Sequence, residues 1–111
     1  MISSVNIAKD FSRFPAGRYK SDGPFPGEVC RRKLLVPALN RSEGVVVVEL
    51  DGTRGYGSSF LEEAFGGLIR EEGFDEATLK SKMQLKSSDP TLVDEIWEYI
   101  SEAQQERRQQ Q

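Results

Sequence analysis

The sequence predicts a single α/β domain, with a small, mostly parallel or mixed sheet and helices packed on it. Its length of 111 residues allows one hydrophobic core. Residues 45–50, VVVVEL, form the apolar run of a strand buried on both faces. Strand and helix patterns alternate along the chain, which is typical of α/β domains with right-handed crossovers.

Further strand patterns occupy residues 4–8, 18–20 and 82–86. Helical spacing covers residues 28–36, 58–72 and the segment after Asp89-Pro90. Pro37 has no amide N–H, so we expect it to end or kink the first helix. Gly66 and Gly67 are unfavourable inside a helix, and we expect them to allow close packing on the sheet. Ser59 and Glu62 have the spacing of a capping box.

The whole chain, residues 1–111, fits one domain, and its polar end, residues 104–111, is expected to fray. No apolar run approaches the ~20 residues that span a bilayer, and the first residues lack a signal-peptide pattern. We therefore expect a cytoplasmic protein with no membrane contact.

The composition disfavours enzymes. The chain has no histidine and one cysteine, Cys30, so the commonest general base is missing and neither a disulfide nor a usual zinc site can form. Cys30 is expected to be inert packing. We expect no metal, no cofactor and no catalytic activity.

Charge is distributed unevenly. Residues 1–41 have a net charge of +5 and residues 42–111 a net charge of −8. In one interpretation the two halves attract each other within the domain. In the other, Arg18 and Arg31 face an external anion. Nucleic-acid binding is not expected, because the pI is near 5.0 and no aromatic residues alternate with the basic ones at a stacking spacing.

One segment is the candidate functional site. It consists of the strand VVVVEL, the loop DGTRGYG and a helix that begins at Ser58-Ser59. Sites in open α/β sheets gather at the carboxyl ends of strands. A phosphoryl group on either serine would meet the free amides and the positive dipole of the helix start. The alternative is that these serines simply cap the helix.

The run DGTRGYGSSFLEEAFGGLIRE, together with PAGRY and GPFPGEVCRRKLLVPAL upstream, resembles a STAS-like bacterial family of uncharacterised proteins. That family is distantly similar to the STAS domains of anti-sigma factor antagonists. The resemblance implies a serine at the strand–loop–helix junction that is phosphorylated by a partner kinase of the histidine-kinase-like ATPase fold. By position this serine is Ser58, with Ser59 beside it.

Our leading hypothesis is a regulatory protein-binding module that docks such an ATPase or serine kinase through residues 56–65. Its docking residues would be Tyr56, Gly57, Phe60 and Glu63. The alternative is a small-anion or nucleotide sensor that uses the Ser58/Ser59 helix start with Arg18 and Arg31. A catalytic role ranks last, because the chain lacks histidine, a reactive cysteine setting and a known metal-ligand spacing. Glu62 and Glu63, as helix neighbours, project in different directions and are not expected to form an acid/base pair.

Overall fold

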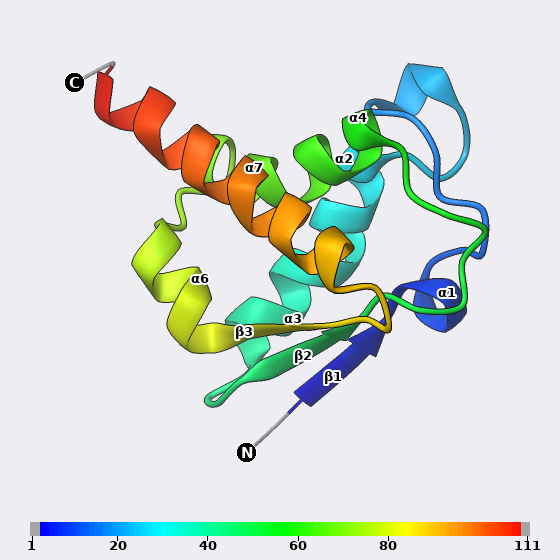
Figure 1. Ribbon diagram of the computed structural model, residues 1–111, viewed down its shortest axis with the longest axis horizontal. Helices are drawn as coiled ribbons and strands as arrows, with labels where there is room; N and C mark the ends of the chain where they lie inside the picture. Colours follow the sequence, from blue (N-terminus) through cyan, green and yellow to red (C-terminus); the bar gives the residue numbers. More distant parts are fainter. Residues whose placement is uncertain (1–2, 110–111) are drawn as a thin grey trace.

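The computed structural model describes residues 3–109. Its sheet has three parallel strands, β1 (Ser3–Asn6), β2 (Val46–Glu49) and β3 (Met83–Lys86), in the order β1-β2-β3. Val48 of β2 lies between Val5 and Leu85 of its neighbours. The α/β class is confirmed, and within the described residues the sheet is wholly parallel (Figure 1).

Three long helices and several short ones pack around the sheet on one side. α2 (Gly27–Cys30), the π-helical turn η2 (Arg31–Leu35) and α3 (Val36–Arg41) follow one another as one helix, and so do α4 (Ser58–Leu61), the π-helical turn η3 (Glu62–Gly66) and α5 (Gly67–Arg70). The others are α1 (Ile7–Asp10), the 3-10 turn η1 (Lys20–Asp22), α6 (Glu76–Lys82) and α7 (Pro90–Gln109).

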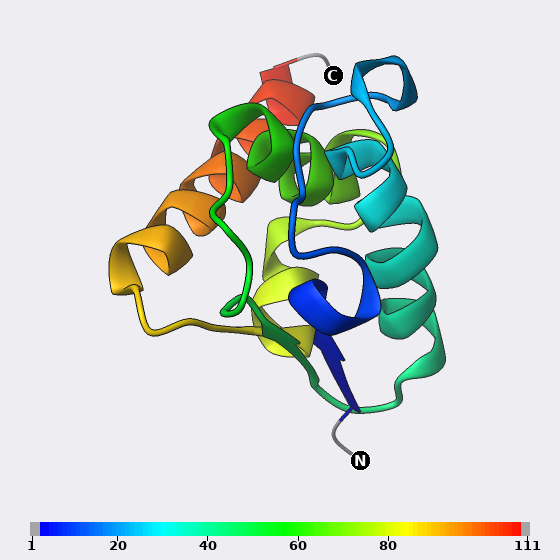
Figure 2. The ribbon, with the colours of Figure 1, turned by 90° about the vertical axis from the view of Figure 1, so that its right-hand side faces the viewer.

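The helices lie over one face of the sheet, as Figures 1 and 2 show. Val46 and Val48 point to this face and are buried, whereas Val45 and Val47 point to the other and are only half-buried. The expectation that this strand is buried on both faces was therefore wrong. Both crossovers lead in the same direction across the sheet, and right-handed connections then place their helices on the same side.

Pro37 does not end the helix that contains it. Just before it, the amide of Val36 donates to the carbonyl of Arg31, five residues back. This π-helical turn shifts the hydrogen-bond register, and the helix continues to Arg41. Of the two predicted outcomes at Pro37, an end or a kink, the end was wrong, because the π-helical turn takes up one extra residue and the helix continues.

One predicted strand boundary and one predicted strand were also wrong. The first strand ends at Asn6, whose side-chain oxygen accepts from the amide of Lys9 and starts α1. Residues 18–20 form no strand, because the Asp22 carboxylate accepts from the amides of Arg18 and Tyr19 and closes a turn. In both places a local side-chain acceptor competes successfully with strand pairing.

The polar end of the chain is ordered helix as far as Gln109, so the expected fraying from residue 104 does not hold there. Gln104 is buried, and its side-chain oxygen accepts from the amide of Glu76 at 2.8 Å. Arg107 donates to the carbonyl of Phe74 at 2.9 Å. The remaining two residues lie outside the described range.

The core lies between the sheet and helices 27–41, 58–70 and α7. Cys30 is buried within it, and burial raises the pKa of its thiol to about 12, which fits the expectation of inert packing. No helix among residues 3–109 combines the length and apolar character needed to cross a membrane. The fully buried large side chains are Ile7, Leu35, Leu39, Leu50, Phe60, Leu61, Phe65, Leu68, Ile69, Leu79, Ile96 and Ile100.

Candidate docking surface at the serine-bearing helix

Ser58 and Ser59 are exposed first residues of the helix that follows β2. The preceding Gly57 has the extended backbone of an N-cap residue and makes no side-chain cap hydrogen bond. The predicted capping box of Ser59 with Glu62 is therefore wrong, because the cap falls two residues earlier. Both serine residues are exposed in the first turn of the helix.

Tyr56 holds the loop that leads to the serines. Its hydroxyl donates to the carbonyl of Leu50 at 2.6 Å, and its ring packs 5.8 Å from that of Phe60. Burial is the main cause that raises the pKa of this hydroxyl to about 12. Of the docking residues predicted from sequence, Tyr56 is thus half-buried and engaged within the loop, while Gly57 is exposed.

Phe60 and Glu63 are buried, so their predicted role as docking residues is wrong. Phe60 is fully covered and packs against Phe11, with ring centroids 6.3 Å apart. Glu63 is only 3% exposed and lies among guanidinium groups. Both side chains hold the helix to the rest of the domain.

Arg18 and Arg31 donate to carboxylates of the acidic half of the chain. Arg31 is buried; its Nη1 donates to both the carbonyl and Oε2 of Glu63 at 2.6 Å, and its Nε donates to Glu72 at 3.0 Å. Arg18 donates to Glu62 and, at 3.1 Å, to Glu63. The proposed external-anion role is therefore not supported for this pair, and the interpretation that the two halves attract each other holds here.

Glu62 shares in this cluster through Arg70, which donates to it at 2.7 Å. Burial works to raise the pKa of Glu62, but hydrogen bonds from Arg70 and then Arg18 outweigh it, and the pKa is lowered. The pKa of Arg18 is raised, chiefly by the hydrogen bond to Glu62. Glu62 and Glu63 are therefore structural ion-pair partners rather than an acid/base pair.

Sequence reasoning missed three exposed aromatic side chains, Phe14, Tyr19 and Phe25, which are 59%, 50% and 38% exposed. They lie in the proline- and glycine-rich loop between α1 and α2. Aromatic residues outside any helical or strand periodicity were the available signal for them. Large apolar side chains exposed together on a small domain indicate an interaction surface.

The aromatic loop lies beside the loop that leads to the serines (Figure 2). The amide of Arg54 donates to the carbonyl of Arg13 at 2.9 Å, and its guanidinium lies 5.6 Å from the ring centroid of Phe14. On the other side, Phe25 packs edge-on against Phe11 at 5.6 Å, and Phe11 contacts Phe60. The contact of Phe14 with Arg54, and that of Phe25 through Phe11 with Phe60, thus connect two exposed aromatic rings to the segment that carries the serines.

A shallow hollow lies at the carboxyl ends of β2 and β3, where α/β domains usually bind ligands. Its wall includes the carboxylates of Asp51 and Asp89. The Asp51 carboxylate accepts hydrogen bonds from the amide of Ser88 and from the hydroxyls of Ser87 and Ser88. The hydrogen bond from the Ser88 amide is the main cause that lowers the pKa of Asp51. Two carboxylates make this hollow unfavourable for anions.

The family comparison matches residues 27–92, more than half of the chain, to a family described as a STAS-like domain of unknown function. The match includes β2, the serine-bearing helix and β3. A search of curated proteins found no match, and neither did a search of solved structures. The chain therefore belongs to the family of STAS-like domains of unknown function.

Proposed function

We propose that this domain is a regulatory protein-binding module that docks a partner through Ser58, Ser59, Phe14 and Phe25, here called the docking surface. The exposure of aromatic side chains on the loop next to the serines is the observation that carries the proposal. Aromatic residues are enriched at protein interfaces, and a few of them supply most of the binding energy.

The serines give this surface a means of regulation. A phosphoryl group on Ser58 or Ser59 would add a charge of about −1.5 to −2 beside the free helix amides. The domain would tolerate it, since both serine residues are exposed. A partner that seats apolar groups against Phe14 and Phe25 would lose affinity, because binding would then desolvate the phosphoryl group.

The resemblance to anti-sigma factor antagonists suggests the class of partner: a cytoplasmic ATPase of the histidine-kinase-like fold that acts as a serine kinase. This partner and the cytoplasmic location are part of the proposal. A small-anion or nucleotide sensor has less support, because Arg18 and Arg31 are paired internally and Asp51 and Asp89 lie at the strand ends.

The first test is site-specific photo-cross-linking in the native host. A photoreactive amino acid replaces Phe14 or Phe25, with the exposed residues Lys33 and Gln105 as control positions. We expect one ATPase to cross-link at the docking surface and not at the control positions. Equal cross-linking at all four positions would refute the docking surface.

The second test measures binding of the purified ATPase. Phe14→Ser is expected to raise the Kd about 30-fold, the effect of losing one dominant interface side chain. Ser58→Glu or Ser59→Glu should weaken binding while the matching alanine variants retain it. Intact-mass analysis of protein from the host should show an increment of about 80 Da. Fragmentation of the protein then shows whether Ser58 or Ser59 carries this increment. Equal affinity of the alanine and glutamate variants for the ATPase would contradict regulation by phosphorylation.

A further inference from the structure

β3 is an edge strand with unpaired backbone groups. The carbonyl of Lys86 accepts from the amide of Leu50, so residue 86 faces β2. Backbone groups of successive residues in a parallel strand point to opposite sides. Leu85 therefore directs its N–H and C=O away from β2, toward the edge where the sheet order places no strand among residues 3–109. Such an edge can pair with another extended chain.

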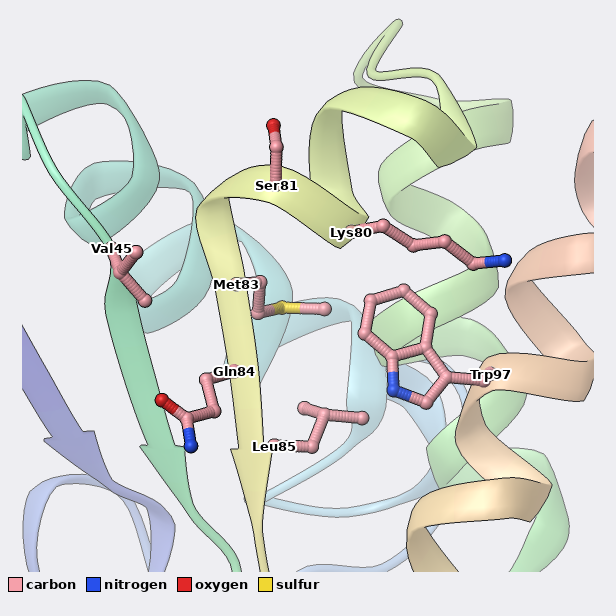
Figure 3. A pocket seen from close by; sticks show the side chains of 7 residues that line it. All are labelled: Val45, Lys80, Ser81, Met83, Gln84, Leu85 and Trp97. Carbon is pink, nitrogen blue, oxygen red and sulfur yellow. The ribbon is translucent and has the colours of Figure 1, made fainter.

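A groove of about 370 Å³ runs beside this edge (Figure 3). Trp97 of α7 and Lys80 of α6 project toward the space next to β3, opposite Met83 and Leu85. Trp97 is half-buried, so part of its indole ring remains open to a bound molecule. The lining residues are Val45, Lys80, Ser81, Met83, Gln84, Leu85 and Trp97. A groove with an apolar wall beside an unpaired strand has the features of a strand-addition site.

The charge at this edge selects the occupant. Lys80, Lys82 and Lys86 surround β3, and Lys80 is the charged member of the groove lining. Lys80 and Lys86 pair with Glu76 and Glu49 at 3.4 and 3.7 Å, but both lysine side chains are more than 60% exposed. Exposed pairs of this kind contribute little and can exchange partners. Carboxylates from outside can therefore reach these ammonium groups.

Lysines also disfavour a second copy of this chain. Two β3 edges that paired about a two-fold axis would bring three lysines of one copy against three of the other. Natural edge strands use lysine in this way to prevent self-association. The same positive charges attract an acidic strand. The edge therefore discriminates between partners by the sign of their charge.

We propose that the β3 edge binds an extended, acidic segment of a partner protein by strand addition. Backbone hydrogen bonds form with Leu85, alternate apolar side chains contact Trp97, and the intervening carboxylates meet Lys86 on the other face of β3. This site is separate from the docking surface and stands independently of the function proposed above.

The probe is a seven-residue peptide of alternating glutamate and valine, compared with one of alternating lysine and valine. Trp97 is the single tryptophan of the chain, so its fluorescence reports directly on the groove. We expect the glutamate peptide to change this fluorescence, and to shift the amide resonance of Leu85 and slow its hydrogen exchange. The lysine peptide should bind at least tenfold more weakly.

Strand pairing is tested by N-methylation of the peptide. Methyl groups on the amides that face β3 should weaken binding at least tenfold, and methyl groups on the alternate amides should be tolerated. Equal effects of the two methylation patterns would overturn the proposal, as would resonance shifts centred away from β3.

Charge selection is tested by reversing Lys80, Lys82 and Lys86 to glutamate, which should invert the peptide preference. A matched control reverses the charge of three exposed lysines elsewhere, Lys9, Lys20 and Lys33. This control variant should still prefer the glutamate peptide. Equal affinity of both peptides for the unmodified protein, or no binding at millimolar peptide, overturns the proposal. So does a change in Trp97 fluorescence with protein concentration alone, because the occupant would then be a second copy.

Discussion

The guanidinium group of Arg31 occupies the space that a side chain at Gly67 would need. A Cβ at Gly67 would lie 2.9 Å from Cζ and 3.0 Å from Cδ of Arg31, and closer still to Nη1. Arg31 reaches this place from the helix of residues 27–41 and donates to Glu63 on the facing helix. The glycine in the second helix therefore makes room for a buried ion pair.

Gly67→Ala should destabilise the domain by about 3 kcal/mol, because the Arg31–Glu63 pair is buried and cannot move without losing partners. Chemical denaturation measures the free energy of unfolding. Gly57→Ala is the control without a steric clash, since a Cβ there meets no atom within 4 Å, and should cost only about 1 kcal/mol, the loss of a favourable N-cap residue. In a double-mutant cycle, Arg31→Met should remove most of the penalty at Gly67. Additive effects would contradict this origin.

Gly27→Ala is expected to destabilise the domain for a different reason. A Cβ at Gly27 would overlap the backbone carbonyl of Phe60 and lie 3.0 Å from the amide of Ala64. Backbone atoms cannot rotate away as a flexible side chain can, so the two helices would have to separate. Loss of the cooperative thermal transition, or a lower midpoint than that of Gly57→Ala, checks this prediction. An unchanged midpoint would show that the helices have room to spare.

Glu62 should make the stability depend on acid pH. Its pKa is lowered in the folded protein, since hydrogen bonds from Arg70 and Arg18 outweigh the effect of burial. The contribution is thus present above the unfolded pKa of about 4.3 and is lost as pH falls through the lower folded value. Glu62→Gln should reduce stability at pH 7 and flatten the acid limb of the curve. The exposed Glu71→Gln serves as control.

The sequence predicted best what local patterns determine. The valine run at residues 45–50 identified β2, and Asp89-Pro90 identified the start of α7. Both depend on neighbouring residues alone. The single covered face of the sheet depends instead on the direction of the crossovers, which no window of sequence contains. The helix α6 was missed because its cap, Asp75, is followed by few apolar residues.

The candidate site was predicted only in part, because its burial depends on distant pairs. Ser58 and Ser59 were correctly placed at a helix start. Glu63 was expected on the surface, as a glutamate usually is. It is buried because Arg31, 32 residues earlier in the chain, meets it. The expected close packing at Gly67 does occur, but against this arginine and not against the sheet.

Gln104 tests whether the polar end of α7 contributes to the fold. Its buried side-chain oxygen accepts from the amide of Glu76, a residue of the first turn of α6. Gln104→Ala should therefore cost about 1 kcal/mol and speed hydrogen exchange at the Glu76 amide. Gln105→Ala, at the exposed neighbouring position, should leave both quantities unchanged. Equal behaviour of the two variants would mean that the helix end frays after all.

The charge variants at the serines should leave the fold intact, which the binding experiments require. Ser58→Glu and Ser59→Glu place a carboxylate on an exposed helix start, where the dipole favours it by about 0.3–1 kcal/mol. We therefore expect both variants to melt near the temperature of the unmodified protein. A large loss of stability in either variant would mean that its hydroxyl is needed by the fold, and a binding defect there would no longer indicate a switch.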